Sequence, residues 1–243
     1  MDKLLFTAVS GATRVITAQQ VLANNLANVN TDGFRADIGL AKSVEIQGKG
    51  LETRTLTGIG STWSDFTPGA LKRTDNPLDV AIRGNGFFAV QVGEDGEAYT
   101  RAGAFHLNEN GDLMLGERPV LGDGGPIAIP EHEKLMIGQD GTISVVTAGS
   151  AAVQEVGKLK LVKPEPNQLR KGEDGLFRTY NGEPVDADQG VTVAVGYLES
   201  SNVNAIDALV KNIDLSRNFE FQIKMMKTAE ELASTGNRLV RGN

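Results

Sequence analysis

The strongest constraint in this sequence is a heptad pattern of apolar residues near the N-terminus. Between residues 2 and 28 the pattern steps alternately by four and three residues, through Leu5, Val9, Ala12, Ile16, Gln19, Ala23 and Leu26. This spacing predicts a helix with one continuous apolar seam, as in a coiled coil. Such a helix, about 40 Å long at 1.5 Å per residue, cannot bury its seam alone and needs a partner. Two interpretations remain open: a helix that folds onto its own domain, and a coiled coil that takes part in assembly.

A second amphipathic segment runs from about residue 202 to the C-terminus. Its apolar seam comprises Ile206, Leu209, Ile213, Phe219, Ile223, Met226 and Ala233, with a slip in phase between Ile213 and Phe219. Charged residues of both signs cover the other faces, a pattern typical of a solvated or packed helix. This segment is the obvious partner for the N-terminal one, so we expect the two termini to pair as a coiled coil.

The residues between these helices predict strands. Short runs of β-branched and aromatic residues, such as 78–82, 87–92 and 158–162, alternate with turn signals such as Asn110-Gly111 and Asp140-Gly141. Many short strands without intervening helices favour meanders and hairpins over βαβ units. The expected fold is therefore mainly β with helical termini. Its expected parts are an N-terminal helix over 1–30, an extended linker region with short strands over 31–66, an all-β domain over 67–198 and a C-terminal helix over 199–243.

Four asparagines, Asn24, Asn25, Asn28 and Asn30, crowd the end of the N-terminal helix, and Gly33 follows them. Asparagine is a poor residue for a helix interior but bonds well to free backbone groups, and glycine accepts a positive φ. A simple helix end needs one such residue. The surplus amides indicate bonding to something beyond the helix, and a polar fraying end is the plainer interpretation.

Composition excludes several functions. The net charge is −7 with no dense basic stretch, which argues against a nucleic-acid partner, and the chain has no cysteine. The N-terminus lacks the features of a secretory signal, and no stretch is long and apolar enough to cross a bilayer. His106 and His132 have no further ligands at metal spacing, and no catalytic motif stands out. We therefore expect no enzyme activity, no cofactor, no metal site and no small-molecule substrate.

Four segments, in order, resemble the signatures of the bacterial flagellar rod and hook family. They are 23–35 around the asparagines, 74–90, 99–105 with 119–122, and 196–204. The resemblance covers nearly the whole chain. One departure is Asp75, which stands where the family pattern leads us to expect glycine. Length and sequence details favour a subunit of the proximal rod; the distal rod subunit and a secreted β-domain binding module are the alternatives.

The resemblance implies a structural subunit of the basal-body rod, which spans the periplasm and transmits torque. Implied partners are other rod proteins, copies of the same chain and the flagellar type III export apparatus, with an export chaperone as a further candidate and no membrane insertion. The terminal helices would form the inner coiled-coil layer of the assembly. The expected assembly interface comprises Leu5, Val9, Ala12, Ile16, Ala23, Asn24, Asn25, Leu26, Asn28, Ile206, Leu209, Ile213, Phe219, Ile223 and Met226.

Overall fold

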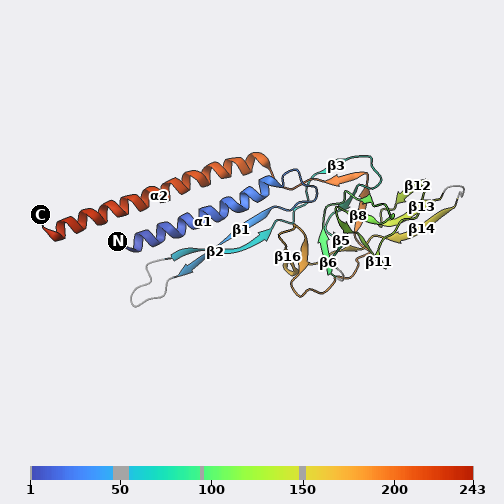
Figure 1. Ribbon diagram of the computed structural model, residues 1–243, viewed down its shortest axis with the longest axis horizontal. Coiled ribbons are helices and arrows are strands. Elements are labelled where there is room, and N and C mark those ends of the chain that lie inside the picture. Colours follow the sequence, from blue (N-terminus) through green and yellow to red (C-terminus); the bar gives the residue numbers. More distant parts are fainter. Residues whose placement is uncertain (1, 46–54, 94–95, 148–151, 243) are drawn as a thin grey trace. The chain divides into compact units, whose positions relative to one another are not determined.

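A computed structural model describes residues 2–45, 55–93, 96–147 and 152–242 (Figure 1). The chain divides into two units. The first, here called the helical unit, comprises Met1–Ala27, Asp37–Asp65 and Val203–Asn243. The second, here called the β unit, comprises Asn28–Ala36 and Phe66–Asn202.

The helical unit contains two long helices and two paired strands. Helix α1 (Asp2–Ala27) and helix α2 (Ala205–Arg241) lie side by side, with the N- and C-termini of the chain at the same end of the pair (Figure 1). Strands β1 (Asp37–Glu45) and β2 (Thr55–Ser64) pair antiparallel, and both contact α1. Neither helix, over the residues described, is long and apolar enough to cross a membrane.

Side-chain capping defines where α2 begins. The side chain of Asn204 accepts hydrogen bonds from the backbone N–H groups of Ile206 (3.0 Å) and Asp207 (3.3 Å), which otherwise have no partner in the first turn. Glu199, where we predicted the C-terminal helix to begin, lies in strand β19 instead. The apolar seam does not reveal this boundary, because the cap lies outside the periodic pattern.

The β unit is built from short strands and one 3₁₀ turn. They are β3 (Leu71–Arg73), β4 (Val80–Arg83), β5 (Phe87–Val92), β6 (Gly96–Thr100), β7 (His106–Leu107), β8 (Leu113–Leu115), β9 (Arg118–Pro119), β10 (Leu121–Gly122), β11 (Gly125–Pro126), β12 (Lys134–Ile137), β13 (Thr142–Val146), β14 (Val153–Lys158), β15 (Leu161–Val162), η1 (Pro166–Gln168), β16 (Leu169–Lys171), β17 (Phe177–Thr179), β18 (Thr192–Val195) and β19 (Tyr197–Glu199).

All described strand pairs in this unit are antiparallel. The largest sheet has the order β15-β5-β6-β17-β16; β12-β13-β14 and β7-β8-β9 form three-stranded sheets; β4 pairs with β18, β3 with β19 and β10 with β11. Local hairpins account for much of this pairing, whereas β18 and β19 return from far along the chain to close the unit against β4 and β3. The predicted fold class, mainly β with an N-terminal and a C-terminal helix, is confirmed.

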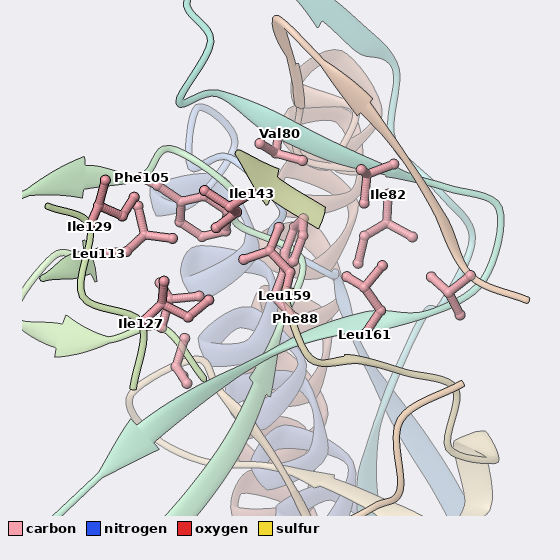
Figure 2. Close-up of a cluster of buried hydrophobic side chains, with 14 of the residues drawn as sticks. Val80, Ile82, Phe88, Phe105, Leu113, Ile127, Ile129, Ile143, Leu159 and Leu161 are labelled. Carbon is pink, nitrogen blue, oxygen red and sulfur yellow. The ribbon is translucent and has the colours of Figure 1, made fainter. Parts of the chain in front are cut away.

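Large apolar side chains fill the centre of the β unit (Figure 2). Phe88 and Phe105 meet edge to face with ring centroids 5.1 Å apart. Leu113, Ile143 and Leu159, drawn from three separate segments, lie beside them and are almost fully buried. Burying a side chain of this size contributes about 1.5–3 kcal/mol, so this cluster gives the β unit a core of its own.

Candidate assembly surfaces

Helix α1 buries a line of small side chains and exposes larger ones. The buried residues are Ala8, Ala12 and Val15, which recur every three or four positions on one side of the helix. Of the predicted seam, only Ala12 is buried; Leu5, Val9, Ile16 and Ala23 are exposed and Leu26 is half-buried. The seam therefore leaves a strip of apolar surface open along α1.

Helix α2 also has exposed residues in its predicted apolar seam. The early seam residues are exposed, with Ile206 at 73% and Ile213 at 54% of their maximum, and Leu209 is exposed with them. The later ones, Phe219, Ile223 and Met226, are half-buried.

The two helices run antiparallel. Gln19 of α1 donates a hydrogen bond to the hydroxyl of Ser216 (3.3 Å), while Gly11, earlier in α1, lies against Gln222, later in α2. Helix α2 has 37 residues and α1 has 26, so α2 is longer by about three turns of 3.6 residues. Its C-terminal end extends past the start of α1 (Figure 1), and Leu239 near that end is 80% exposed. Apolar surface thus also remains open at the tip of the pair.

Asn25 connects helix α1 to strand β1. Its side-chain oxygen accepts a hydrogen bond from the backbone N–H of Asp37, and its amide group donates to the carbonyl of the same residue, both at 2.8 Å. Asn25 is buried. These two hydrogen bonds resemble those between paired strands. The side-chain oxygen and amide group of Asn25 are therefore both satisfied within the chain.

The other asparagines lie around the turn that follows the helix. The carbonyl oxygen of the Asn28 side chain accepts from the hydroxyl of Thr31 (3.1 Å), and Asn24 and Asn30 are exposed. Gly33 has a φ of 69°, and its N–H donates to the carbonyl of Glu199 (2.6 Å). A Cβ at Gly33 would overlap the backbone of Arg101 and Ala102, so the predicted positive-φ glycine is confirmed and close packing also requires it.

A buried charge cluster, whose members were not among the predicted site residues, follows this turn in the β unit. Arg35 donates through Nη2 to Oε1 of Glu199 (2.6 Å), and Arg101 donates through Nε to Oε2 (2.8 Å). All three side chains are at most 2% exposed. Burial lowers the pKa of Arg101; Glu199 opposes that shift, and the positive charge of Arg35 adds to it.

The sequence did carry a weak signal for this cluster. Each of the three charged residues directly follows an apolar or strand-forming stretch inside a segment that resembles the flagellar family: Phe34-Arg35, Tyr99-Thr100-Arg101 and Tyr197-Leu198-Glu199. A charge inside such a stretch is rarely buried without a partner. The partners lie more than 60 residues apart, so no local pattern joins them.

Neither histidine belongs to a group of potential metal ligands in the described parts of the chain. His106 is exposed, and Nδ1 of His132 lies 2.9 Å from the carbonyl of Pro130, two residues before it. The side-chain oxygen of Asn108 accepts hydrogen bonds from the backbone N–H groups of Asn110 and Asp112, a pattern typical of a hairpin turn. No group of three or more His, Asp or Glu side chains is placed to hold a metal within the described parts of the chain.

Comparison with family models gives three matches in chain order. Residues 5–35 match the model described as "Flagella basal body rod protein", residues 81–145 the "Flagellar hook protein FlgE/F/G D1 domain", and residues 194–239 the "Flagellar basal body rod FlgEFG protein C-terminal". The two outer matches fall on α1 and α2 and the middle one on the β unit.

Individual relatives match over the full length of the chain. The flagellar basal-body rod protein FlgF of Escherichia coli strain K12 is 39% identical over 248 residues, covering 99% of both chains. FlgF of Salmonella typhimurium strain LT2 is 38% identical over the same length and coverage. The rod protein FlgG of Buchnera aphidicola from Acyrthosiphon pisum is 32% identical over 245 residues, covering 89% of this chain and 93% of that one.

Proposed function

The chain belongs to the flagellar basal-body rod protein family, with FlgF among its most similar members, and we propose that it joins its neighbours through its two terminal helices. It is a structural subunit of the flagellar basal-body rod. The predicted resemblance to the rod and hook family is confirmed, because the matching models and relatives span both helices and the β unit.

The observation that carries the assembly role is the apolar surface that a single chain leaves open on α1 and α2. Leu5, Val9 and Ile16 on α1, and Leu209 and Ile213 on α2, are exposed on helices whose buried contacts involve mainly small residues. Exposed apolar strips of this kind are typical of surfaces that become buried in an assembly. Neighbouring subunits would cover them by coiled-coil packing of helix against helix.

The similarity to FlgF supports a finer assignment. We place the chain in the proximal rod, where it contacts other rod proteins and copies of itself, and where rigid packing of the β units lets it transmit torque. Contacts that repeat from one subunit to the next without closing a ring build a helical tube. Delivery by the flagellar type III apparatus, with or without a chaperone, suits a chain whose helices gain their full packing only on assembly.

The main test is deletion of the gene and complementation. Loss of the protein should abolish motility and stop rod growth, and cryo-electron microscopy of basal bodies that contain a tagged chain should place it in the proximal segment. Position in the distal segment would favour the distal rod alternative. Normal rods and motility after deletion would contradict a rod function and would favour a secreted binding module.

A pair of variants tests the role of the helix surface. Substituting both Leu209→Glu and Ile213→Glu places charges on the exposed apolar strip of α2, and the variant should fail to restore motility although it folds. Lys211→Glu changes an exposed residue of the same helix turn and should restore motility. Full activity of the double variant would show that this strip contacts no neighbour.

A further inference from the structure

Three asparagines of the sequence are followed directly by glycine, and all three pairs lie outside the strands of the β unit. They are Asn85-Gly86, Asn110-Gly111 and Asn181-Gly182. Glycine has no Cβ to shield its backbone nitrogen, so this nitrogen can reach the side-chain carbonyl carbon of the asparagine before it. Each pair can in principle close a cyclic imide, and the fold decides which of them has the freedom to do so.

The surrounding chain holds two of these pairs. Gly86 is buried, and a Cβ placed on it would lie only 2.8 Å from the side chain of Val191. At the second pair, the backbone N–H of Gly111 donates to the carbonyl of Asn108 (3.1 Å), and the carbonyl of Gly111 accepts from Ile129 (2.7 Å). Ring closure requires the peptide unit between asparagine and glycine to turn toward the asparagine side chain. Close packing opposes this rotation at the first pair, and hydrogen bonds oppose it at the second.

The third pair is exposed and loosely held. Asn181 and Gly182 are both exposed, and a Cβ on Gly182 would meet no heavy atom within 4 Å among the described residues, its chain neighbours apart. The N–H of Gly182 donates to the carbonyl of Thr179 at 3.3 Å, which is longer than the usual range of about 2.7–3.2 Å. The peptide unit between Asn181 and Gly182 can therefore turn without displacing a neighbour.

Hydrogen bonds direct the side chain of Asn181 back toward its own backbone. Its Nδ2 donates to Oε2 of Glu183 (2.7 Å), and its Oδ1 accepts from the backbone N–H of Glu183 (3.3 Å). An asparagine bonded in this way to the second residue along the chain folds its amide over the peptide unit between them. That peptide unit contains the nitrogen of Gly182, so the carbon and the nitrogen of the reaction lie on the same side of the turn.

We propose that Asn181 is a site of spontaneous deamidation. The nitrogen of Gly182 loses its proton to hydroxide and attacks Cγ of Asn181. The bond from Cγ to Nδ2 then breaks, and Nδ2 takes a proton from water and leaves as ammonia, which restores the hydroxide. A second water opens the cyclic imide at either carbonyl carbon, which gives aspartate or isoaspartate at position 181. The net reaction exchanges ammonia for water without oxidation or reduction, and it does not depend on the proposed rod function.

The product changes the contacts of this turn. A carboxylate at position 181 cannot donate to Glu183, and it places a second negative charge beside the first. The turn also lies next to the edge of the largest sheet, where β16 pairs with β17 and the N–H of Tyr180 donates to the carbonyl of Gln168 (3.1 Å). Deamidation should therefore loosen this edge of the β unit.

The test is incubation of the full isolated chain at mildly alkaline pH, followed by digestion and mass spectrometry of the three peptides. A sample unfolded in guanidinium chloride serves as the reference, because it exposes all three pairs alike. In the folded sample Asn85 and Asn110 should convert at least about tenfold more slowly than in the reference, since they react only through local opening. Asn181 should stay within a few-fold of its reference rate. Equal slowing of Asn181, or faster conversion at either other pair, would overturn the proposal.

Variants of the full chain test the route and its effect. Asn181→Gln keeps the amide but needs a larger ring, so conversion at this position should cease over the same time, while the exposed control Asn212→Gln should leave Asn181 unaffected. Ring opening gives both aspartate and isoaspartate, whereas direct hydrolysis gives aspartate alone, so aspartate without isoaspartate would refute the imide route. Asn181→Asp should speed hydrogen exchange of the Tyr180 amide, and unchanged exchange would refute the effect on the sheet edge.

Discussion

The two units of the chain bury different kinds of side chain. In the β unit, Phe88, Leu113 and Ile143 are completely enclosed. In the helical unit, the buried apolar side chains that the structure describes are small, namely Ala8, Ala12, Val15, Ala208 and Ala229, while larger ones such as Phe6 and Phe221 are exposed. Buried apolar area is the main source of folding stability. The β unit therefore has a core of large side chains within one chain, whereas the helical unit leaves many of its large apolar side chains exposed.

The largest expected effect lies in the β unit, at Glu199. The substitution Glu199→Gln leaves Arg35 and Arg101 buried without a counter-charge and should lower the free energy of unfolding of this unit by about 3–5 kcal/mol. Chemical denaturation, with hydrogen exchange of amides in β4 and β5 as a local readout, measures it. The exchange of amides in α1 and α2 should change much less, because the cluster lies in the β unit.

A surface ion pair provides the control for this effect. Asp174 accepts two hydrogen bonds from Arg178, and both side chains are more than a quarter exposed. Asp174→Asn should cost less than about 1 kcal/mol. Hydrogen bonds from Arg178 lower the pKa of Asp174, so this contribution is present above the unfolded pKa of the carboxyl group and is lost as the pH falls through the folded value. Equal losses for the two variants would mean that the buried cluster does not stabilise the β unit.

The next effect contrasts a core residue with a helix-surface residue. Leu113→Ala removes a fully buried side chain of the β unit and should cost about 2–5 kcal/mol. Ile213→Ala, on the exposed strip of α2, should change the stability of the isolated chain by less than about 0.5 kcal/mol. Denaturation of both variants and a motility assay distinguish them, since Ile213→Ala should impair assembly without unfolding the chain. A large loss of stability from Ile213→Ala in the isolated chain would show that α2 is already fully packed there.

Much of this architecture was predictable from local patterns. The apolar seams predicted both helices, and the turn glycines Gly33 and Gly111 do have positive φ. The seam pattern alone could not decide which face of α1 is buried: the line through Ala8 and Val15 is covered, and the neighbouring line through Val9 and Ile16 is open. Periodicity identifies the apolar side of a helix. It does not tell which part of that side is covered, because the covering residues lie elsewhere in the chain or on another subunit.

The buried cluster could not be predicted for a different reason. Arg35, Arg101 and Glu199 come from three distant segments, and their contacts depend on the return of β19 beside β3. Their burial is a property of the folded unit, because each charge is tolerated only when the others are in place.

A smaller effect tests the helical unit at Asn25. Asn25→Ala removes both hydrogen bonds to Asp37 and leaves the backbone groups of that residue without their partner, which should cost about 1–3 kcal/mol. Hydrogen exchange of β1 and of the last turns of α1 should show the loss, while the amides of the β unit stay protected. Gln20→Ala, exposed on the same helix, is the control and should have little effect. Unchanged exchange in Asn25→Ala would mean that this asparagine does not hold α1 to β1.

The smallest effect concerns Asp75, the one described non-glycine residue with a positive φ, at 60°. Its backbone N–H donates to the carbonyl of Gly196 (3.2 Å), so the turn is fixed in this conformation, and its exposed ion pair with Arg73 is screened by solvent and contributes little. Glycine adopts this backbone freely, which favours the folded state, but it also gives the unfolded chain more conformational entropy, which disfavours it. In Asp75→Gly these two effects oppose one another, so the free energy of unfolding should stay within about 0.5 kcal/mol of that of the natural chain. Asp75→Val, with a branched side chain in the left-handed region, should lose about 1–2 kcal/mol. Thermal denaturation of the two variants checks this order, and equal stability of glycine and valine at position 75 would show that the backbone here relaxes without strain. Position 75, where the family resemblance leads us to expect glycine, would then accept a residue with a branched side chain without strain.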